Sequence, residues 1–401
     1  MKNCLDLDRL WQNLEDLGKL AETPDGICRL AYSPAFWESN SFVERLMREA
    51  GLSVSANKVG NVIGTLPGES DHKIVIGSHI DSVVNGGKYD GCLGVLAGIE
   101  VARALKKEGY HPRHSIEVCA WAEEEGLTIA GLVGSRAYCG LEPTETMLSK
   151  MQQFGFDEDD FRRAKADGPI DFSLELHIEQ GGVLEAEHIN IGVVSAIIAQ
   201  KRYWVEFRGT ANHAGTTPMS LREDALVKAA RFIQRVDEIV RETDSSMVGT
   251  VGKVEVFPNA VNTIPGRVGL TLELRSLNEH SIDRAYSRLL TESAQDIDSI
   301  RLTMEQPSYK MDPAVRAAIH QAAEMSGYSA RDMGSGAGHD SMSLAQVTRA
   351  GMIFVPSVGG ISHSREERTE RADIERGAQV LYDTVKLLDQ KDNESDGRNE
   401  Q

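Results

Sequence analysis

The chain has 401 residues, a length that exceeds a single compact core of typical size and therefore predicts two domains. Its apolar content of 41% and charged content of 26% are those of a soluble globular protein. The formal net charge of -18, from 61 acidic and 43 basic residues, argues against nucleic acid or an anionic membrane as partner and says nothing about catalysis.

The N-terminal segment and the cysteines favour a cytoplasmic protein. The first twenty residues carry acidic side chains through an amphipathic pattern and lack the basic start and apolar run of a signal peptide. No apolar run approaches the roughly 18 residues that a transmembrane helix needs. The cysteines are odd in number and share no CxxC spacing, as expected for reduced thiols. They are Cys4, Cys28, Cys92, Cys119 and Cys139.

Apolar periodicity predicts helices and strands in alternation along the chain. The predicted helices cover residues 5–21, 35–50, 92–108, 222–242, 281–297, 313–326 and 372–389. Apolar runs rich in β-formers occupy residues 73–80, 115–125, 172–181 and 351–360. Near-continuous apolar runs suit parallel strands that are buried on both faces. In each run the polar residues of interest fall at or just beyond the C-terminal end, where open α/β sheets place their ligands.

The middle of the chain has a different pattern, which predicts an inserted domain at residues 196–308. Its strands are longer and joined by hairpin-like turns, as in an α+β arrangement with an antiparallel sheet and two helices. The main α/β domain, with a mostly parallel sheet, is then expected to be discontinuous and to combine residues 1–195 with 309–401. The polar residues 390–401 predict a disordered tail.

Histidines and carboxylates gather at the ends of the apolar runs. The five candidate metal ligands are His79, Asp90, Glu125, His177 and His363. Imidazole and carboxylate together suit zinc, manganese or a similar divalent ion. A carboxylate is the natural bridge between two such ions, because each of its two oxygens can hold one of them, and Asp90 lies in a glycine-rich loop where the backbone can approach closely.

Two further carboxylates have expected roles beside these ligands. Asp81 comes two residues after His79, where its carboxylate can accept the second ring N–H and fix the tautomer. Within the run of glutamates at 123–125, we assign Glu125 to the metal and Glu124 to the general base, because an activated water needs a nearby proton acceptor. Burial near other carboxylates would raise the pKa of Glu124 to a value that suits neutral pH.

Taken singly, each of these features also has a structural explanation. A histidine at a strand end is more often structural than a ligand, and a run such as EEEG is usually a solvated end of a helix or strand. The glycine-rich segment 334–340 is not followed by GK[ST], so a phosphate-binding loop is not indicated. HExxH and GxSxG motifs are absent from the sequence. The order and context of the five candidates together indicate a metal centre.

With these residues in place, the chain resembles the two-metal aminoacylase and carboxypeptidase-like family of metallohydrolases. Within that family, it resembles the branch of N-carbamoyl-L-amino acid hydrolases, allantoate amidohydrolases and β-ureidopropionases. The segments that carry the resemblance follow the family's order over nearly the whole chain. They are GSHIDSVVNGGKYDG, AEEEG, ELHIEQG, NHAGTTPM, NAVNTIPG, LELRS, GSGAGHDS and PSVGGISHSREE.

The resemblance implies two divalent ions per subunit, Zn²⁺ or Mn²⁺, with Asp90 as their bridge and Glu124 as the base. His213 matches a histidine that family members deliver across a dimer interface to the developing oxyanion, so a homodimer and a lid or dimerisation role for the inserted domain are also implied. Further positions match residues that hold the carboxylate and carbonyl of the substrate, namely Gln180, Asn262, Arg275 and His339. The guanidinium of Arg275 can bind a carboxylate through two parallel hydrogen bonds.

The activity implied by the resemblance is metal-dependent hydrolysis of the linear ureido bond of an N-carbamoyl-L-amino acid, which yields the free amino acid, ammonia and carbon dioxide. Allantoate amidohydrolase is one alternative, and an aminoacylase or dipeptidase is another. After EEEG many relatives carry a small residue and then Arg-Phe, whereas this chain reads LTIAGLVGSRAYCG, so the sequence leaves the exact substrate open. A non-catalytic binding protein would lack ligands, but all five candidates and the base are present.

Overall fold

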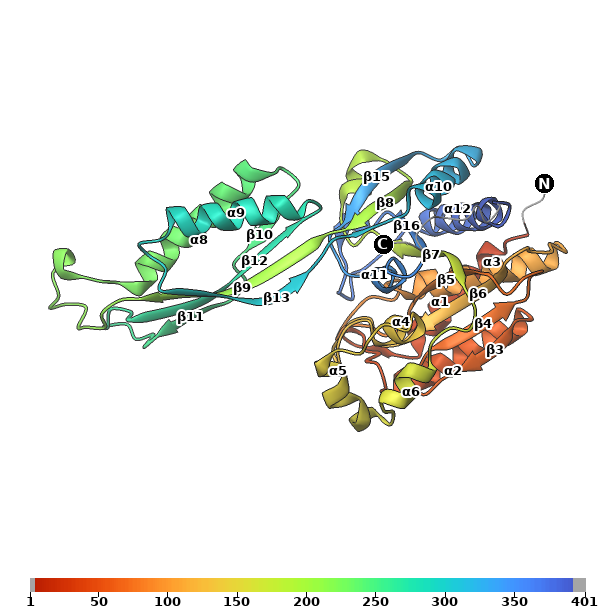
Figure 1. Cartoon of the computed structure of the whole chain (residues 1–401), viewed down its shortest axis with the longest axis horizontal. Coiled ribbons are helices and arrows are strands. Elements are labelled where there is room, and N and C mark those ends of the chain that lie inside the picture. Colours follow the sequence, from red (N-terminus) through yellow and green to blue (C-terminus); the bar gives the residue numbers. More distant parts are fainter. Residues whose placement is uncertain (1–3, 392–401) are drawn as a thin grey trace, which may run out of the picture. The chain divides into compact units, whose positions relative to one another are not determined.

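The computed structural model describes residues 4–391, which form two compact units. One unit combines the chain up to Ser195 with the chain from Lys310 onward, and the other runs from Ala196 to Tyr309 (Figure 1). From residue 392 onward, the predicted polar tail lies outside the described residues.

The first unit is built on a 9-stranded sheet with a parallel centre. Its strands are β3 (Ser53–Ala56), β4 (Val62–Leu66), β5 (Lys73–His79), β6 (Ser115–Trp121), β7 (Ile170–Ile178), β8 (Ile191–Ile197), β14 (Tyr309–Lys310), β15 (Ala330–Ser335) and β16 (Arg349–Val355). The order is β14-β8-β16-β7-β5-β6-β4-β3, with β15 paired to β8. The pairs β16–β7, β7–β5 and β5–β6 are parallel, and β5 is buried along its whole length. That burial is expected for a parallel strand covered on both faces.

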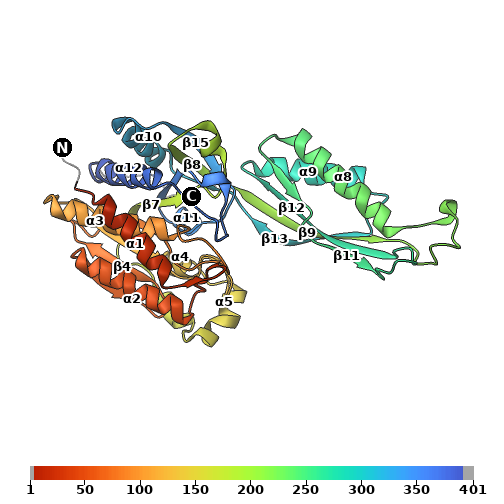
Figure 2. The same cartoon turned by 180° about the vertical axis from the view of Figure 1, so that it is seen from behind.

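Helices cover this sheet. The longer helices of the unit are α1 (Leu7–Lys19), α2 (Pro34–Glu49), α3 (Cys92–Lys107), α10 (Pro313–Met325) and α12 (Arg371–Asp389). Of these, α1, α2 and α10 begin at residues whose side chains cap them. Asp312 accepts the first free N–H groups of α10, and Ser33 does the same for α2, each followed by a proline that suits the first helical turn. Helix α3 packs on β5, β6 and β7. It also packs against α12, and both helices are seen from behind in Figure 2. Their apolar side chains form one large core with the sheet.

Shorter helices lie in the connections of the first unit. They are α4 (Val133–Tyr138), α5 (Glu145–Lys150), α6 (Glu158–Arg163), α7 (Val183–Glu187) and α11 (Ser341–Leu344). Helix α11 contacts β7 and β16, and α4 contacts β6. A small hairpin, β1 (Glu22–Thr23) and β2 (Gly26–Ile27), follows α1.

The second unit has a 5-stranded antiparallel sheet with two helices. Its elements are β9 (Ala199–Arg208), α8 (Ala225–Thr243), β10 (Val248–Thr250), β11 (Val254–Phe257), β12 (Arg267–Ser276), α9 (Glu279–Glu292) and β13 (Ser299–Gln306). Strand β9 pairs with β12 on one side and β13 on the other, both antiparallel. Alternate residues of β9 and β12 are buried beneath the helices, which gives the unit a core of its own.

The large sheet departs from the mostly parallel sheet expected from the sequence. Strands β3 and β4 pair antiparallel with each other, β4 pairs antiparallel with β6, and β8 pairs antiparallel with β16. The sheet is therefore mixed, with parallel strands at its centre and antiparallel strands at its flanks. The expected helices are all present, with ends that differ by up to five residues, whereas α4, α5, α6, α7 and α11 were not expected.

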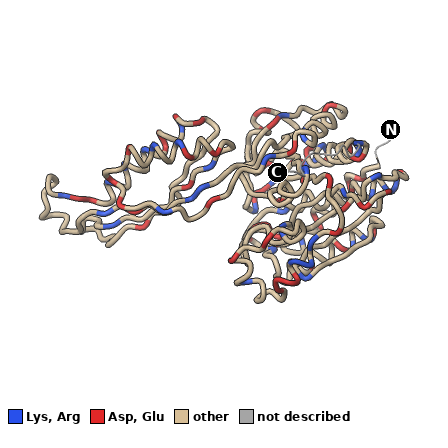
Figure 3. The backbone as a smooth tube through the Cα atoms, viewed as in Figure 1, with Lys and Arg blue, Asp and Glu red and all other residues tan. Residues whose placement is uncertain are grey.

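Charge and hydropathy place few further constraints on the molecule. Acidic and basic residues are interspersed over each unit (Figure 3). Among the described helices, none combines the length and apolar character that a membrane span requires.

Candidate metal centre

The parallel strands bring the five candidate ligands to one edge of the large sheet. His79 is the last residue of β5, and His177 lies one residue before the end of β7. Glu125 follows β6, and His363 follows β16. Because these four strands are adjacent and parallel, their carboxyl ends meet at the same edge.

The side chains converge on Asp90. Its Oδ1 lies 3.1 Å from Nε2 of His177 and 3.5 Å from Nε2 of His79, and its Oδ2 lies 3.2 Å from Nε2 of His363. Ligand atoms of His79, Asp90 and His177 lie within 4.8 Å of one another, as do those of Asp90, Glu125 and His363. The two groups share Asp90, which is the arrangement that a carboxylate bridge between two ions requires.

Backbone carbonyls fix the tautomers of two of the histidines. Nδ1 of His79 donates to the carbonyl of Asp81 at 3.0 Å, and Nδ1 of His177 donates to the carbonyl of Ile178 at 2.9 Å. Nε2 of each ring therefore faces Asp90, and loss of the Nε2 proton would free the lone pair that a metal requires.

The expected hydrogen bond from His79 to the carboxylate of Asp81 is corrected by the structure. The ring N–H goes to the backbone carbonyl of Asp81, and the nearest carboxylate oxygen lies 3.8 Å away. The carboxylate instead accepts the backbone N–H groups of Glu124 at 3.3 Å and Glu125 at 3.2 Å. Asp81 therefore positions the two glutamates with its side chain and His79 with its backbone.

Gly91 allows Asp90 and His79 to approach each other. It has φ +64, and a Cβ at this position would lie 2.5 Å from Nε2 and Cδ2 of the His79 ring. A residue with a side chain would be strained here and would push the ring aside. The requirement for glycine after Asp90 thus follows from the ligand geometry itself.

The electrostatics of the cluster favour a bound cation. Burial raises the pKa of Glu124 well above its usual value, and burial together with the charge of Asp90 raises the pKa of Glu125 to about 7. Burial opposes ionisation of Asp90, but hydrogen bonds from His177, His363 and His79 hold its pKa well below the usual value. Buried carboxylates that repel one another in this way are stabilised by positive charge among them.

Unpartnered oxygen atoms show that the residues present fit a metal. Oε1 of Glu125 and Oε1 of Gln180 are buried and lack a hydrogen-bond partner within the described chain. They border a cavity of about 200 Å³ whose other lining residues are His79, Asp90, Glu124, His177, Ala337, Gly338, His339 and His363. Nitrogen and oxygen donors of this kind suit zinc or manganese.

Two predicted substrate residues of the first unit also lie at this cavity. Nε2 of Gln180 donates to Oδ2 of Asp90 at 2.9 Å, so this amide is anchored on the candidate bridge. The buried ring of His339 packs edge-on against His177, with ring centroids 4.5 Å apart, and its Nε2 lies 2.8 Å from Oγ of Ser335. Burial and the neighbouring His177 lower the pKa of His339 well below its usual value, which keeps the ring neutral.

The other predicted substrate residues belong to the second unit. His213 and Asn262 lie on adjoining segments, where the Ala214 N–H donates to the Asn262 carbonyl at 2.9 Å. Nδ1 of His213 accepts the Gly215 N–H at 3.0 Å, so the neutral ring carries its proton on Nε2. Arg275 on β12 forms an ion pair with Glu273 at 2.7 Å.

Several residues of the centre were not anticipated from the sequence. Glu367 accepts the backbone N–H groups of Tyr89 and Asp90, and Ser362 donates to Glu367 at 2.8 Å. Glu175 accepts from Oγ of Ser78 at 2.8 Å and thereby links β7 to β5. Glu175 lies two residues before His177 on the same strand, which is the one signal that could have indicated it.

The fold and the site together define the class of metal-dependent hydrolases. The family model described as "Peptidase family M20/M25/M40" matches residues 75–387, and the chain belongs to this family. It is an amidohydrolase, a hydrolase that acts on carbon–nitrogen bonds other than peptide bonds. The resemblance seen in the sequence is thereby confirmed.

Similar proteins cover almost the whole chain. An N-carbamoyl-L-amino acid amidohydrolase of Geobacillus stearothermophilus is 39% identical over 407 residues, which is 96% of this chain and 98% of the relative. An allantoate amidohydrolase of Bacillus subtilis is 34% identical, covering 92% and 94% of the two chains. The crystal structure of a hydantoinase/carbamoylase family amidase from Burkholderia multivorans has a TM-score of 0.87 and 36% identity, with coverage of 95% and 97%.

Proposed function

We propose that this amidohydrolase cleaves the ureido bond of an N-carbamoyl-L-amino acid, releasing the amino acid, ammonia and carbon dioxide. The observation that carries the proposal is the pair of ligand groups that share Asp90, with Glu124 beside them. The Geobacillus stearothermophilus relative, which is 39% identical to this chain, bears the name of this activity.

In this proposal two divalent ions, Zn²⁺ or Mn²⁺, are held by the two groups that share Asp90. His79, Asp90 and His177 form one group, and Asp90, Glu125 and His363 form the other. When bound, the ions would supply Lewis-acid polarisation of the ureido carbonyl and lower the pKa of a nearby water.

Glu124 is the residue that moves the proton. Its Oε2 lies 3.9 Å from Nε2 of His79, and the Asp81 carboxylate holds its backbone N–H. The raised pKa of Glu124 suits a group that takes a proton from the attacking water and returns it to the leaving nitrogen. General acid–base catalysis of this kind contributes about 10²–10⁴-fold to the rate.

The remaining predicted residues bind and orient the substrate. We assign Arg275 to the substrate carboxylate, because its guanidinium presents two parallel donors. His213 donates to the oxyanion, supported by the Nε2–H tautomer that the Gly215 N–H selects. Asn262, Gln180 and His339 hold the polar groups of the substrate. The family resemblance supports a homodimer, and the N-terminal segment and the cysteine pattern support a cytoplasmic location.

A substrate panel tests this function against its alternatives. The Mn²⁺- or Zn²⁺-loaded protein is offered N-carbamoyl-L-amino acids, allantoate, 3-ureidopropionate and N-acetyl amino acids, and released ammonia and amino acid are measured. Ammonia from an N-carbamoyl-L-amino acid is the expected result, and preferred turnover of allantoate would move the chain to that activity. Free amino acid from acetylated substrates without ammonia would indicate an aminoacylase, and a protein inert on the whole panel would refute the proposal.

A further inference from the structure

Glu367 lies outside the ligand set but forms hydrogen bonds with Asp90, with its neighbour Tyr89 and with Ser362, the neighbour of His363. The residue is 5% exposed. Its Oε1 accepts the backbone N–H of Tyr89 at 3.0 Å and that of Asp90 at 3.2 Å. Its Oε2 accepts from Oγ of Ser362 at 2.8 Å. One carboxyl group therefore holds the backbone at the candidate bridge and the residue next to His363.

These contacts connect two loops that are far apart in the sequence. Asp90 lies in the loop between β5 and α3, whereas Ser362 and Glu367 lie between β16 and α12. Oγ of Ser362 also lies 3.4 Å from Oδ2 of Asp90, so the same hydroxyl reaches both carboxylates. The Glu367 N–H donates to the Ser364 carbonyl at 3.0 Å, in a turn that directs the chain back toward Asp90.

No lysine or arginine of the described residues forms an ion pair with Glu367. The oxygens of its buried carboxyl group accept hydrogen bonds from Tyr89, Asp90 and Ser362 instead. A buried carboxyl group is costly unless its hydrogen bonds repay the loss of water. The position of Glu367 is thus determined by the backbone of the Asp90 loop and by Ser362.

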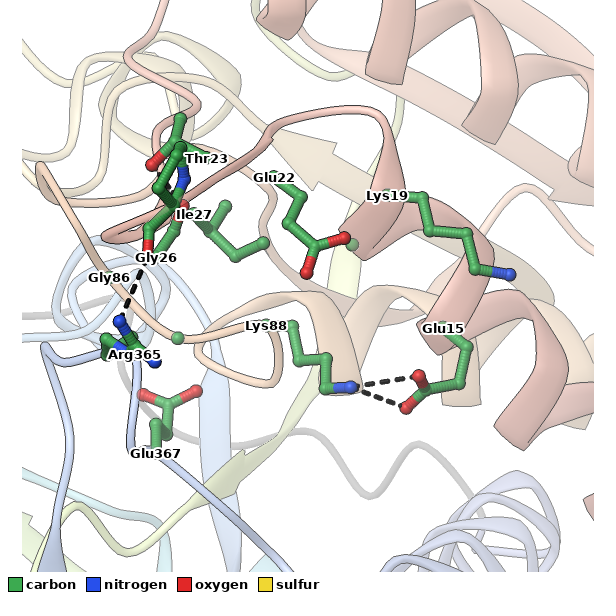
Figure 4. Close-up of a pocket in the computed structure, with 13 residues that line it drawn as sticks. Glu15, Lys19, Glu22, Thr23, Gly26, Ile27, Gly86, Lys88, Arg365 and Glu367 are labelled. Atoms are coloured by element: carbon green, nitrogen blue, oxygen red, sulfur yellow. Dashed lines mark hydrogen bonds and ion pairs between the residues drawn. The ribbon is translucent and has the colours of Figure 1, made fainter.

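Gly87 leaves the space that Glu367 occupies. A Cβ at Gly87 would lie 2.1 Å from Cδ and Oε1 of Glu367, so any other residue would displace the carboxyl group. Glu367 also lines a second cavity, of about 280 Å³. Figure 4 shows Glu367 and Arg365 at one side of that cavity and the Lys88–Glu15 ion pair at the other. Substitutions at residue 87 therefore perturb Glu367 without removing its carboxyl group.

We propose that Glu367 is a positioning residue that holds the Asp90 loop in register with the His363 loop, so that Asp90 can serve both metal groups at once. The inference rests on the proposed function, because it takes Asp90 and His363 as ligands. Mutation of a group that orients metal ligands in this way typically lowers metal affinity by about 10–100-fold.

The test measures the affinity of purified protein for Mn²⁺ and Zn²⁺ by competition with a chromogenic chelator, with the melting temperature recorded in parallel. Glu367→Ala is expected to lower the affinity for the second equivalent of metal by about 10–100-fold. Glu367→Gln is expected to rescue most of this loss, because its amide oxygen can still accept the two backbone N–H groups. Gly87→Ala is expected to behave like Glu367→Ala.

Gly86→Ala is the matched control. Its added methyl approaches nothing closer than 3.1 Å, at a Val83 side-chain carbon, and it does not meet Glu367. Wild-type metal affinity in Gly86→Ala is therefore expected.

Asp90→Asn separates the inference from the function on which it rests. Wild-type affinity in Asp90→Asn would mean that the assigned ligand set is wrong. Weakened binding in Asp90→Asn, together with wild-type affinity in folded Glu367→Ala and Gly87→Ala, would overturn the role of Glu367 alone. A lower melting temperature without any change in metal affinity would likewise overturn it, because that is the signature of a purely structural residue.

Discussion

Replacing Gly91 by alanine should separate backbone strain from damage to the ligand geometry. The added Cβ would lie 2.5 Å from the His79 ring, and ordinary carbon contacts begin near 3.5 Å, so the ring must move by about 1 Å. A displacement of that size costs roughly 100-fold in rate when it misplaces a reacting group. The positive φ of +64 adds a conformational cost of about 1–3 kcal/mol to the free energy of folding.

Gly109→Ala is the matched control for this prediction. Gly109 has φ +71, but a Cβ there would meet nothing within 4 Å. The positive φ should cost both variants about 1–3 kcal/mol in urea unfolding, and the clash with the His79 ring should add to that loss in Gly91→Ala only. Only Gly91→Ala should lose kcat/KM for ammonia release, by roughly 100-fold, together with metal content. A Gly91→Ala enzyme with the kcat/KM and metal content of Gly109→Ala would refute the reasoning.

Three further predictions address the metal, the substrate carboxylate and the stability of the first unit. Chelation should abolish activity and Zn²⁺ or Mn²⁺ should restore it, while circular dichroism stays unchanged because the apolar core does not involve the ligands; activity that survives exhaustive chelation would contradict the metal assignment. Arg275→Lys should raise KM by about tenfold or more and change kcat less, because a lysine cannot form two parallel hydrogen bonds to a carboxylate; Arg202→Lys, which alters the other arginine paired with Glu273, is the control and should leave KM unchanged. Asp389 hydrogen-bonds to His114 and raises its pKa, so this contribution to stability is complete below about pH 6.5 and is lost as the pH rises through the folded-state pKa. His114→Asn should therefore destabilise the protein more at about pH 6 than at about pH 9 in urea titrations, and an equal loss at both pH values would contradict this.

The sequence indicated the candidate centre because several histidines and carboxylates together fall at the ends of apolar runs. Near-continuous apolar runs end at His79, Glu125 and His177, and parallel strands bring such ends to one edge. The inserted unit was equally visible, because its strands are long and alternate between buried and exposed residues. The antiparallel strands at the flanks of the large sheet could not be predicted in this way. Strands such as β3 are short and largely exposed, and their residue pattern resembles that of a loop.

Two features of the centre depend on backbone geometry that a sequence pattern does not encode. The backbone carbonyl oxygen of Asp81 lies nearer to Nδ1 of His79 than the carboxylate oxygen of Asp81 does. The turn after β5 determines which of these two oxygens is nearer. Glu367 binds backbone N–H groups that are 278 and 277 residues away along the chain, and a backbone donor leaves no mark on residue type. Residues that act through the main chain therefore became visible only in the folded structure.

The most direct test of the central claim is ammonia release from an N-carbamoyl-L-amino acid by the wild-type protein and Glu124→Gln at equal metal content. Glu124 belongs to neither group that shares Asp90 but lies near His79 and Glu125, so the comparison is made at equal metal content. We predict that the wild type releases ammonia and that Glu124→Gln is slower by about 10²–10⁴-fold. Equal rates in the two metal-loaded proteins would contradict the assignment of Glu124 as the base at this centre.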